Sequence, residues 1–438
     1  MKYLQKKTIV QCILAFFVTL ALLVTALVAT TAIPNEAIYD NMVESALTYK
    51  TTERYAFDET RQLRRISDNY ADNILLNVLW NMKSDTPLRS ALDTVYYDGE
   101  GQGLNLGLYS TITEGSEPNA DYTRYWHGMV VVLRPLLLLF NITQIKWIGL
   151  GTAVLLLAVN VTLLCRKKQY FVAAALPLSY VGVHFWWMVK SAEYQPAILL
   201  SLLFTLLFVL FEKKGETALL CLSVMSGVAI SFFDFLTTET LTILIPLAVV
   251  LLLWQAEERL GNWKQNLPFL VKSVLAWGGA YGLTFVAKWS LASLVLQENK
   301  FVMAVSSAAE RVSGTEGADN LPLYQQIPFA VLGNISTLFG GIARVDFYNI
   351  VLGLMITILA AGVLLYLFRG NYQKDITILM LLLGLVPYIR YLVLNNHSYL
   401  HEFFTYRAQA ITILALLSAL WYNTDKSLLS RKKKRRRK

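Results

Sequence analysis

The stretch Asp121–Phe140, DYTRYWHGMVVVLRPLLLLF, decides how the chain is organised, because it looks like a membrane span but is too short to be one. Its apolar part, Gly128–Phe140, has thirteen residues and contains Arg134. A helix of that length covers roughly 20 Å, whereas bilayer hydrocarbon is ~30 Å thick. On a helical wheel His127 lies about 20° from Arg134 and about 60° from Arg124. We therefore expect a helix at the membrane surface with one cationic edge.

The composition indicates a polytopic membrane protein. Of 438 residues, 55% are hydrophobic and only 16% are charged, which excludes a soluble globular protein. The first hydrophobic run, Thr8–Ala32, is too long for the core of a signal peptide, so residues 1–32 are expected to hold a retained first span. The cysteines lie in hydrophobic runs and are interpreted as packing residues: Cys12, Cys165 and Cys221.

About ten membrane spans are expected, with both termini in the cytoplasm. The nine runs after the first are 146–165, 170–189, 195–212, 217–233, 240–254, 272–296, 348–368, 376–394 and 405–422. With this number, the basic clusters between the runs all fall on one face, which the positive-inside rule makes cytoplasmic. The basic tail, 423–438, is then a contact for anionic lipid rather than for nucleic acid. The apolar run 326–344 would reverse this order if it crossed, so we expect it to be re-entrant or interfacial.

Residues 33–145 are expected to form a large extracytoplasmic loop with amphipathic surface helices, and 297–346 a second outer loop. Within the large loop the sequence predicts one helix in Ile33–Tyr49 and another over Asp68–Met82, from the spacing of their apolar residues. Between Tyr97 and Asn119 the Gly, Asn and Ser content predicts an irregular segment. A loop of this length is typical of a functional subdomain.

Two carboxylates of this loop are candidates for chemistry. Asp68 and Asp72, in DNYAD, are four residues apart and would share one face of a helix. Such a pair can hold a divalent cation such as Mg²⁺ or Mn²⁺, or can supply a general base whose pKa is raised by its neighbour. The alternative is a solvated helix start, where acids favour the helix dipole.

Cationic and aromatic groups supply the remaining candidates. Two guanidiniums on the predicted surface helix suit a phosphate or pyrophosphate, although long side chains also reach lipid headgroups. His397 and His401, in NNHSYLHEFFTYR, are spaced for one helix face, with Tyr406 and Arg407 following. They could bind zinc, but without a clear third ligand, hydrogen bonding to a polar substrate or interfacial anchoring is preferred. Asp234, in SFFDFLTTET, lies between phenylalanines and needs a partner such as an arginine.

The layout resembles that of the GT-C superfamily of integral-membrane glycosyltransferases, in which a single span precedes a large outer loop and a bundle of further spans. The stretches IPNEAIYDNMVESA, DNYADNILLN, RYWHGMVVVLRPLL, FFDFLTTET and NNHSYLHEFFTYR are also similar to a group of polytopic membrane proteins of Gram-positive bacteria. The GT-C resemblance implies transfer of a sugar from a polyprenyl-phosphate donor. It also implies a carboxylate soon after the first span, a place held here by Glu36 and Asp40.

We therefore expect an inverting glycosyltransferase in the cell membrane, with its active site facing outside and an envelope polysaccharide or glycolipid as acceptor. Asp72, supported by Asp68, is expected to be the base, with Asp40 and Glu36 as the other carboxylates that the resemblance favours. The residues expected to bind substrate or the departing phosphate are Arg124, Tyr125, Trp126, His127, Arg134, Asp234, His397, His401, Tyr406 and Arg407. The expected partners are membrane lipid, the lipid-linked donor and the glycan acceptor, and not nucleic acid.

Two other classes of function fit the same residues. A transporter or flippase of a lipid-linked saccharide would place ionisable residues at mid-membrane depth and break helices in paired halves. A non-catalytic partner in envelope polysaccharide assembly would keep the layout without the chemistry.

Overall fold

The computed structural model describes residues 6–100, 103–313, 323–367 and 373–424. In these ranges the chain is almost entirely helical, with two sheets of two strands each. Eight of the described helical segments are long and apolar enough to cross a membrane. The prediction of an all-α polytopic membrane protein is thereby confirmed.

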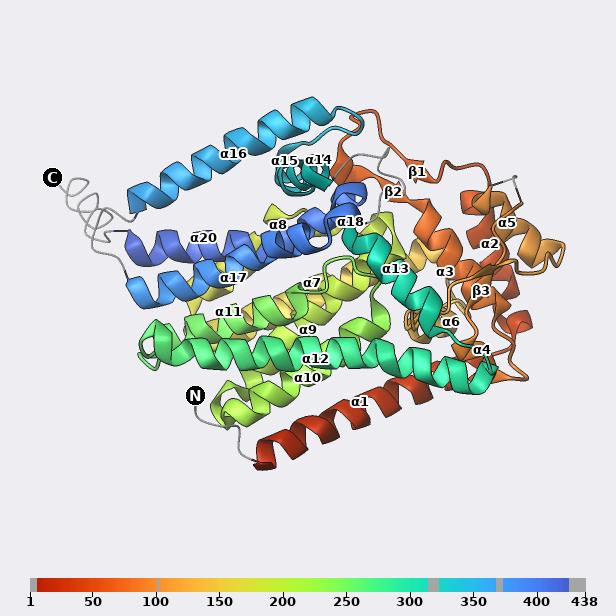
Figure 1. Ribbon diagram of the computed structural model, residues 1–438, viewed down its shortest axis with the longest axis horizontal. Coiled ribbons are helices and arrows are strands. Elements are labelled where there is room, and N and C mark those ends of the chain that lie inside the picture. Colours follow the sequence, from red (N-terminus) through yellow and green to blue (C-terminus); the bar gives the residue numbers. More distant parts are fainter. Residues whose placement is uncertain (1–5, 101–102, 314–322, 368–372, 425–438) are drawn as a thin grey trace.

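The long helices run side by side along the longest axis of the molecule (Figure 1). They are α1 (Lys6–Thr31), α7 (Ile142–Arg166), α9 (Gln195–Phe211), α10 (Glu216–Phe233), α12 (Trp263–Leu296), α16 (Asp346–Leu367), α17 (Lys374–Val393) and α20 (Ala410–Asn423). Local signals set several of their starts. The side chains of Asn141 and Gln144 cap the first turn of α7 reciprocally, and Asn262 and Gln265 do the same for α12.

Two predicted spans form apolar helices that are shorter than those eight segments. The run 170–189 divides into α8 (Tyr170–Gly182) and a separate turn, η3 (Phe185–Lys190), because His184 adopts a left-handed backbone conformation with φ +54°. The run 240–254 forms α11 (Leu241–Ala256), in which every residue from Leu241 to Leu253 is buried. A helix that is apolar all round belongs inside a bundle, so α11 packs against protein rather than lipid.

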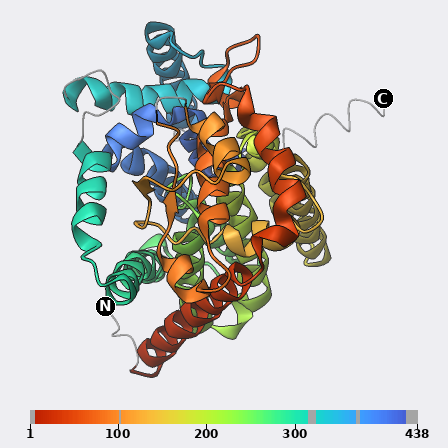
Figure 2. The same cartoon turned by 90° about the vertical axis from the view of Figure 1, so that its right-hand side faces the viewer.

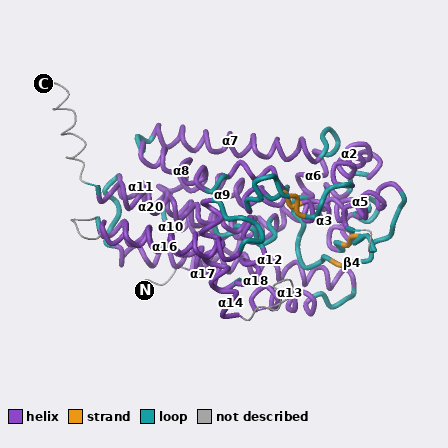
Figure 3. Tube along the Cα trace, turned by 90° about the horizontal axis from the view of Figure 1, so that it is seen from above, coloured by secondary structure: helices purple, strands orange, loops and turns teal. Residues whose placement is uncertain are grey.

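Other helices keep an exposed apolar surface. α1 and α16 lie along opposite edges in Figure 1, and few of their residues are buried. α7 lies along a further edge in Figure 3 and exposes Leu155. Apolar side chains exposed along whole helices are expected where lipid replaces water as the solvent.

The predicted re-entrant or interfacial run forms three short helical pieces, α14 (Leu323–Pro328), η6 (Phe329–Gly333) and α15 (Asn334–Phe339). η6 is a π-helical turn, which interrupts the regular hydrogen bonding of the run. The run is seen nearly end-on in Figure 1, whereas α16 crosses the page, so it lies across the bundle. This orientation agrees with a segment that does not traverse the bundle lengthwise.

Residues 33–100 and 103–141 form a compact subdomain at one end of the bundle, which we call the loop end and which faces the viewer in Figure 2. Its helices are η1 (Asn35–Ile38), α2 (Tyr39–Lys50), η2 (Leu63–Arg65), α3 (Asn69–Asn81), α4 (Pro87–Leu92), α5 (Leu104–Thr113) and α6 (Val130–Leu136). Its strands are β1 (Tyr55–Ala56), β2 (Ser67–Asp68), β3 (Val95–Tyr96) and β4 (Ala120–Asp121), paired β1–β2 and β3–β4. The helices predicted in Ile33–Tyr49 and over Asp68–Met82 are confirmed as η1 with α2 and as α3.

The predicted irregular segment between Tyr97 and Asn119 is wrong in its centre, where α5 forms. Leu108 and Ile112 of α5 are buried in the same apolar cluster as residues of α2 and α3. This burial stabilises the helix despite its Gly, Asn and Ser content, because tertiary packing outweighs weak local propensity.

The predicted surface helix over Asp121–Phe140 is also wrong. Only α6, seven residues long, is a regular helix in that stretch. Before it, His127 has φ +53°, and the neighbouring Gly128 donates its amide hydrogen to the Phe232 carbonyl with an N···O distance of 3.0 Å. A Cβ at Gly128 would lie 2.4 Å from that oxygen, so only glycine permits this approach. The stretch is therefore a docking loop and not a helix with a cationic edge.

The remaining pieces close the bundle at its two ends. At the loop end these are η4 (Ala192–Tyr194), α13 (Phe301–Ser313), α18 (Asn395–Leu400), α19 (Glu402–Thr405) and η7 (Tyr406–Gln409), and at the opposite end η5 (Glu212–Lys214). α1 begins and α20 ends at that opposite end (Figure 1).

Candidate functional site

A pocket of about 600 Å³ opens at the loop end, between the subdomain and the segment that carries α18 and α19. It is lined by Glu53, Arg54, Tyr55, Phe57, Leu63, Ile66, Ala343, Arg344, Leu400, His401 and Phe403. Tyr55 and Phe403 contact each other across it, with ring centroids 5.5 Å apart. The pocket thus combines charged groups with aromatic walls, as ligand sites commonly do.

Asp68 lies directly behind this pocket, because it pairs with Tyr55 in the β1–β2 ladder. Its Oδ1 accepts a hydrogen bond from the Ala71 amide and so caps the start of α3. The side chain is 4% exposed, and burial, together with the nearby charge of Asp72, raises the pKa of Asp68 to about 7. A carboxyl group with such a pKa can accept or release a proton near neutral pH.

Asp72 has a different environment and does not fit the role predicted for it. Its Oδ1 accepts hydrogen bonds from the Ser191 hydroxyl and the Ala192 amide, at 2.8 and 2.7 Å. Its Oδ2 accepts from the Tyr49 hydroxyl and the Lys146 ammonium, at 2.7 and 3.0 Å. Four donors saturate the carboxylate, which therefore ties the subdomain to α7 and η4 as a buried ion pair.

The predicted metal site at Asp68 and Asp72 is not supported by these donors. Asp72 can offer an oxygen to a cation only by giving up the Lys146 pair or the contacts at Ser191, and Asp68 already caps α3. Across the residues that the structure describes, three or more His, Cys, Asp or Glu side chains do not gather in one metal-sized group.

Arg407 is the least satisfied buried charge at the loop end. It is 2% exposed, and none of its three side-chain nitrogens has an acceptor at hydrogen-bond geometry in the described part of the chain. The guanidinium lies against aromatic rings, 4.7 Å from the Tyr194 centroid and 5.0 Å from that of Tyr406. A buried guanidinium with open donors is suited to a planar, multivalent acceptor such as a phosphate.

Tyr194 connects Arg407 with Asp68. Its hydroxyl interacts electrostatically with both side chains. Its ring also contacts Phe404, with centroids 5.5 Å apart, and Phe404 contacts the pocket residue Phe403. Tyr194 therefore links the carboxyl group with the guanidinium beside the residues that line the pocket, and we call this group the Asp68–Arg407 site.

Further cationic groups surround this site. Arg64, from η2, forms a 2.8 Å hydrogen bond with the His184 ring and donates to the Leu338 carbonyl. The positive charges of Arg64 and Arg407 both act on His184. Arg65 pairs with Asp58 at 3.1 Å. Two cationic side chains that lack a carboxylate partner among the described residues, Arg64 and Arg407, therefore lie near His184, which favours an anionic ligand there.

Arg134, predicted to contact phosphate, is instead fully bonded within the protein. Its guanidinium donates to the carbonyl oxygens of Ile33, Leu79 and Met82 and to Oδ1 of Asn35. Burial lowers its pKa to about 10, so that it stays charged at neutral pH. Arg134 fastens the end of α1 to α3, and its predicted role is wrong because its donors point inward.

The other predicted residues of the docking loop lie in an aromatic cluster. Arg124 stacks on the rings of Tyr122 and Tyr125, and Tyr125 contacts Phe235 and Phe285. Trp126 is buried and donates to the Thr284 carbonyl at 2.8 Å. The buried His127 ring contacts the Tyr122 carbonyl, and burial lowers its pKa to about 3. These residues are not grouped with Arg134 on one helix face.

Of the remaining predicted residues, some meet at the loop end and others do not. His401 lines the pocket, its ring lies 4.7 Å from that of His397, and Tyr406 contacts His184. Asp234 is bonded to Thr237 rather than to an arginine. The two remaining carboxylates, Glu36 and Asp40, are exposed near the start of α2, away from the pocket lining.

Sequence reasoning missed four residues that form polar contacts at the loop end. They are Arg64, Lys146, Tyr194 and Arg390. Lys146, Tyr194 and Arg390 each lie within or next to an apolar run, where an ionisable or hydroxylated residue is a signal in itself. The four were overlooked because their partners lie far away in the sequence.

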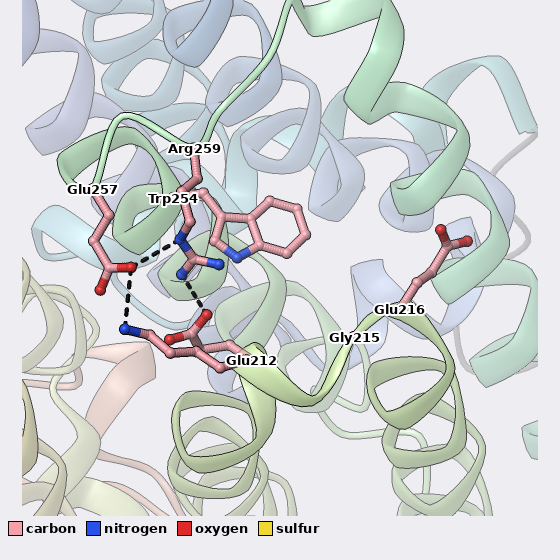
Figure 4. A pocket seen from close by; sticks show the side chains of 7 residues that line it. Glu212, Gly215, Glu216, Trp254, Glu257 and Arg259 are labelled. Carbon is pink, nitrogen blue, oxygen red and sulfur yellow. Dashed lines mark hydrogen bonds and ion pairs between the residues drawn. The ribbon is translucent and has the colours of Figure 1, made fainter.

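A second pocket, of about 360 Å³, lies at the opposite end of the bundle (Figure 4). Arg259 there reaches the carboxylates of both Glu212 and Glu257, while Lys167 and Lys213 pair with Glu212 and Glu257 in turn. Because these charges neutralise one another, the network fastens the ends of α7, α9 and α11 and is a weaker candidate for a ligand site.

Comparison of the chain with protein-family models, with curated proteins and with solved structures finds no match.

Proposed function

We propose that the protein is a membrane glycosyltransferase that uses a polyprenyl-phosphate sugar donor at the loop end. One observation carries this proposal: a buried carboxyl group with a pKa of about 7, at Asp68, shares a site with the open guanidinium of Arg407. Transfer of a sugar from a phosphate needs a base for the acceptor and a cation for the leaving group. The GT-C-like layout and the exposed apolar helices support a lipid-linked donor.

In the proposed reaction, Asp68 takes over the role first predicted for Asp72. Ionised Asp68 accepts the proton of an acceptor hydroxyl as its oxygen attacks the anomeric carbon from the side opposite the phosphate. The anomeric carbon–oxygen bond breaks, and its electron pair leaves with the phosphate, whose charge Arg407 neutralises. The proton remains on Asp68, the anomeric configuration inverts, and charge is conserved.

The test compares surface glycans, by mass spectrometry, between wild-type cells, cells lacking the gene and complemented cells. We expect deletion to remove one sugar or branch, and neither Asp68→Asn nor Arg407→Gln to restore it. Asp58→Asn, which removes only the half-exposed partner of Arg65, is the matched control and should restore it. Each variant must reach the wild-type amount in the membrane, so that lost activity is separated from lost protein.

The outcomes separate the proposed roles. Once the sugar is known, loss of Arg407 is expected to slow transfer about 10²–10³-fold, the usual effect of removing a group that stabilises developing charge. Full complementation by Asp68→Asn would overturn the base assignment. An unchanged glycan profile in deletion cells would overturn the proposed glycosyltransferase activity. Transport of a lipid-linked saccharide by the purified protein in liposomes would then favour the transporter class.

A further inference from the structure

A second polar group surrounds the loop between α10 and α11, residues 234–239. Arg390 of α17 donates to both Glu239 carboxylate oxygens, at 2.7 and 3.0 Å, and to the Leu236 carbonyl at 2.6 Å. The His397 ring contacts the same carbonyl at 2.9 Å. Leu236 has φ +65°, a strained conformation that these two side chains hold in place. The loop is therefore held by side chains about 150 positions away in the sequence.

Some polar atoms of this group have no hydrogen-bond partner in the described part of the chain. Arg390 is 6% exposed, yet its Nη1 has no hydrogen-bond partner within the described ranges. The same holds for the buried hydroxyl of Tyr281 and for Nδ1 of the buried His127. Buried polar groups normally have partners, so three open ones around one loop indicate a place where a polar ligand completes the bonding.

Aromatic rings form the other wall. Tyr125 contacts Phe235 and Phe285 with ring centroids 5.1 and 6.0 Å apart, and Phe285 contacts Tyr281 at 5.2 Å. Trp289 continues the row, 6.0 Å from Phe285. Such rings offer flat apolar faces beside polar tips.

The charges of the group favour a neutral ligand. Glu239 is neutralised by Arg390, and burial together with the charge of Glu239 raises the pKa of Asp234 to about 7. The Tyr281 hydroxyl lies in the field of both carboxyl groups. An anion would meet the two acids, whereas hydroxyl groups can both donate to them and accept from Arg390.

We infer that the Asp234–Glu239 loop, Arg390, Tyr281 and the adjoining aromatic row bind a saccharide unit of the acceptor. Sugar hydroxyls fill the open donors and acceptors, and the apolar face of the sugar ring packs on the aromatic row. A chain of ring contacts leads from His397 through Phe404 to Tyr194, and hence to Arg407. This deepens the proposed function, on which its assignment to the acceptor rests.

Saturation-transfer NMR on the full chain in lipid nanodiscs tests the inference, with methyl β-glucoside, methyl β-galactoside and methyl β-N-acetylglucosaminide as probes. Nanodiscs replace maltoside detergents, whose sugar heads would compete. We expect at least one probe to bind. Tyr281→Phe should weaken that probe about tenfold, because it removes one hydroxyl and keeps the ring. Tyr180→Phe is the matched control, since it removes a buried tyrosine hydroxyl that bonds Ser201 elsewhere in the bundle.

Each outcome decides the inference. Failure of all three probes to bind the wild-type protein overturns it, and so does equal binding by wild-type protein and Tyr281→Phe. Arg407→Gln should keep glycoside binding, which separates this inference from the proposed function. If binding depended on Tyr281 but the glycan profile of deletion cells were unchanged, the saccharide-binding site would be supported and the glycosyltransferase activity would be rejected.

Discussion

Arg134 and Arg407 are both buried in the loop-end half of the molecule, and both were expected to contact phosphate, yet their environments are opposite. Arg134 donates to four acceptor groups, three of them backbone carbonyls, and so joins two segments of the subdomain. Arg407 has no such acceptor in the described part of the chain and lies between aromatic rings. Burial of a charge therefore does not reveal its role, whereas the use of its hydrogen-bond donors does.

The same contrast distinguishes two carboxylates only four residues apart. Asp72 accepts four hydrogen bonds and pairs with Lys146, while Asp68 caps a helix and keeps a pKa near neutrality. In each pair, one residue uses all of its hydrogen-bonding atoms and holds the subdomain on the bundle; these are Arg134 and Asp72. The other residue, Arg407 or Asp68, keeps hydrogen-bonding capacity that is available for chemistry.

The largest expected effect is on the free energy of unfolding, when each of the two arginines is replaced by methionine. Arg134→Met should cost roughly 3–5 kcal/mol, because it leaves buried carbonyl oxygens without donors. Arg407→Met should leave stability unchanged or raise it, since it removes a buried charge that has no ion-pair partner. Reversible SDS-induced unfolding in mixed micelles measures both. A loss at Arg407 as large as that at Arg134 would contradict the comparison.

The next largest effect is on stability when Asp68 and Asp72 are each replaced by asparagine. The pKa of Asp68 is raised in the folded protein, so the folded state holds its proton more tightly than the unfolded state. Its contribution to stability is complete below about pH 4 and is lost as the pH rises towards 7. Asn cannot ionise, so the Asp68→Asn protein does not lose this stability as the pH rises, and Asn can still cap α3. At pH 8 the variant should therefore be more stable than wild type by up to about 4 kcal/mol.

Asp72→Asn should have the opposite sign at pH 8, because it leaves Lys146 buried without its partner. Unfolding measured at pH 5 and pH 8 checks both variants, and the gain from Asp68→Asn should shrink at the lower pH. If both substitutions destabilised the protein equally at pH 8, the distinction between the two carboxylates would fail.

The smallest effect tests the docking loop that leads into α6 and Arg134. Gly128→Ala places a methyl group 2.4 Å from the Phe232 carbonyl, so something must move, at an expected cost of about 1–3 kcal/mol. Gly151→Ala in α7 is the matched control, because nothing lies within 4 Å of its added methyl group. The apparent unfolding temperature in nanodiscs, at one fixed heating rate, compares them. Equal temperatures would show that the loop tolerates displacement.

The sequence by itself determined the class of the protein. Long apolar runs separated by basic clusters require membrane helices, because only regular backbone hydrogen bonding is tolerated in lipid. Periodic apolar residues determined η1 with α2 and also α3, since an amphipathic face must be buried. The stretch NNHSYLHEFFTYR was likewise recognisable as polar and aromatic beside a span, and it contains Arg407.

Only the tertiary structure decided which polar residues are structural. Arg134 finds its acceptors about 50 and 100 residues away, and Asp72 finds Lys146 74 residues away. The helical wheel failed for Asp121–Phe140 because the approach of Gly128 to Phe232 imposes a loop, which no local spacing reveals. Whether a charged group has all of its hydrogen bonds depends on partners that are distant in the sequence. For that reason the sequence could identify these charged residues but could not tell the structural ones from those available for chemistry.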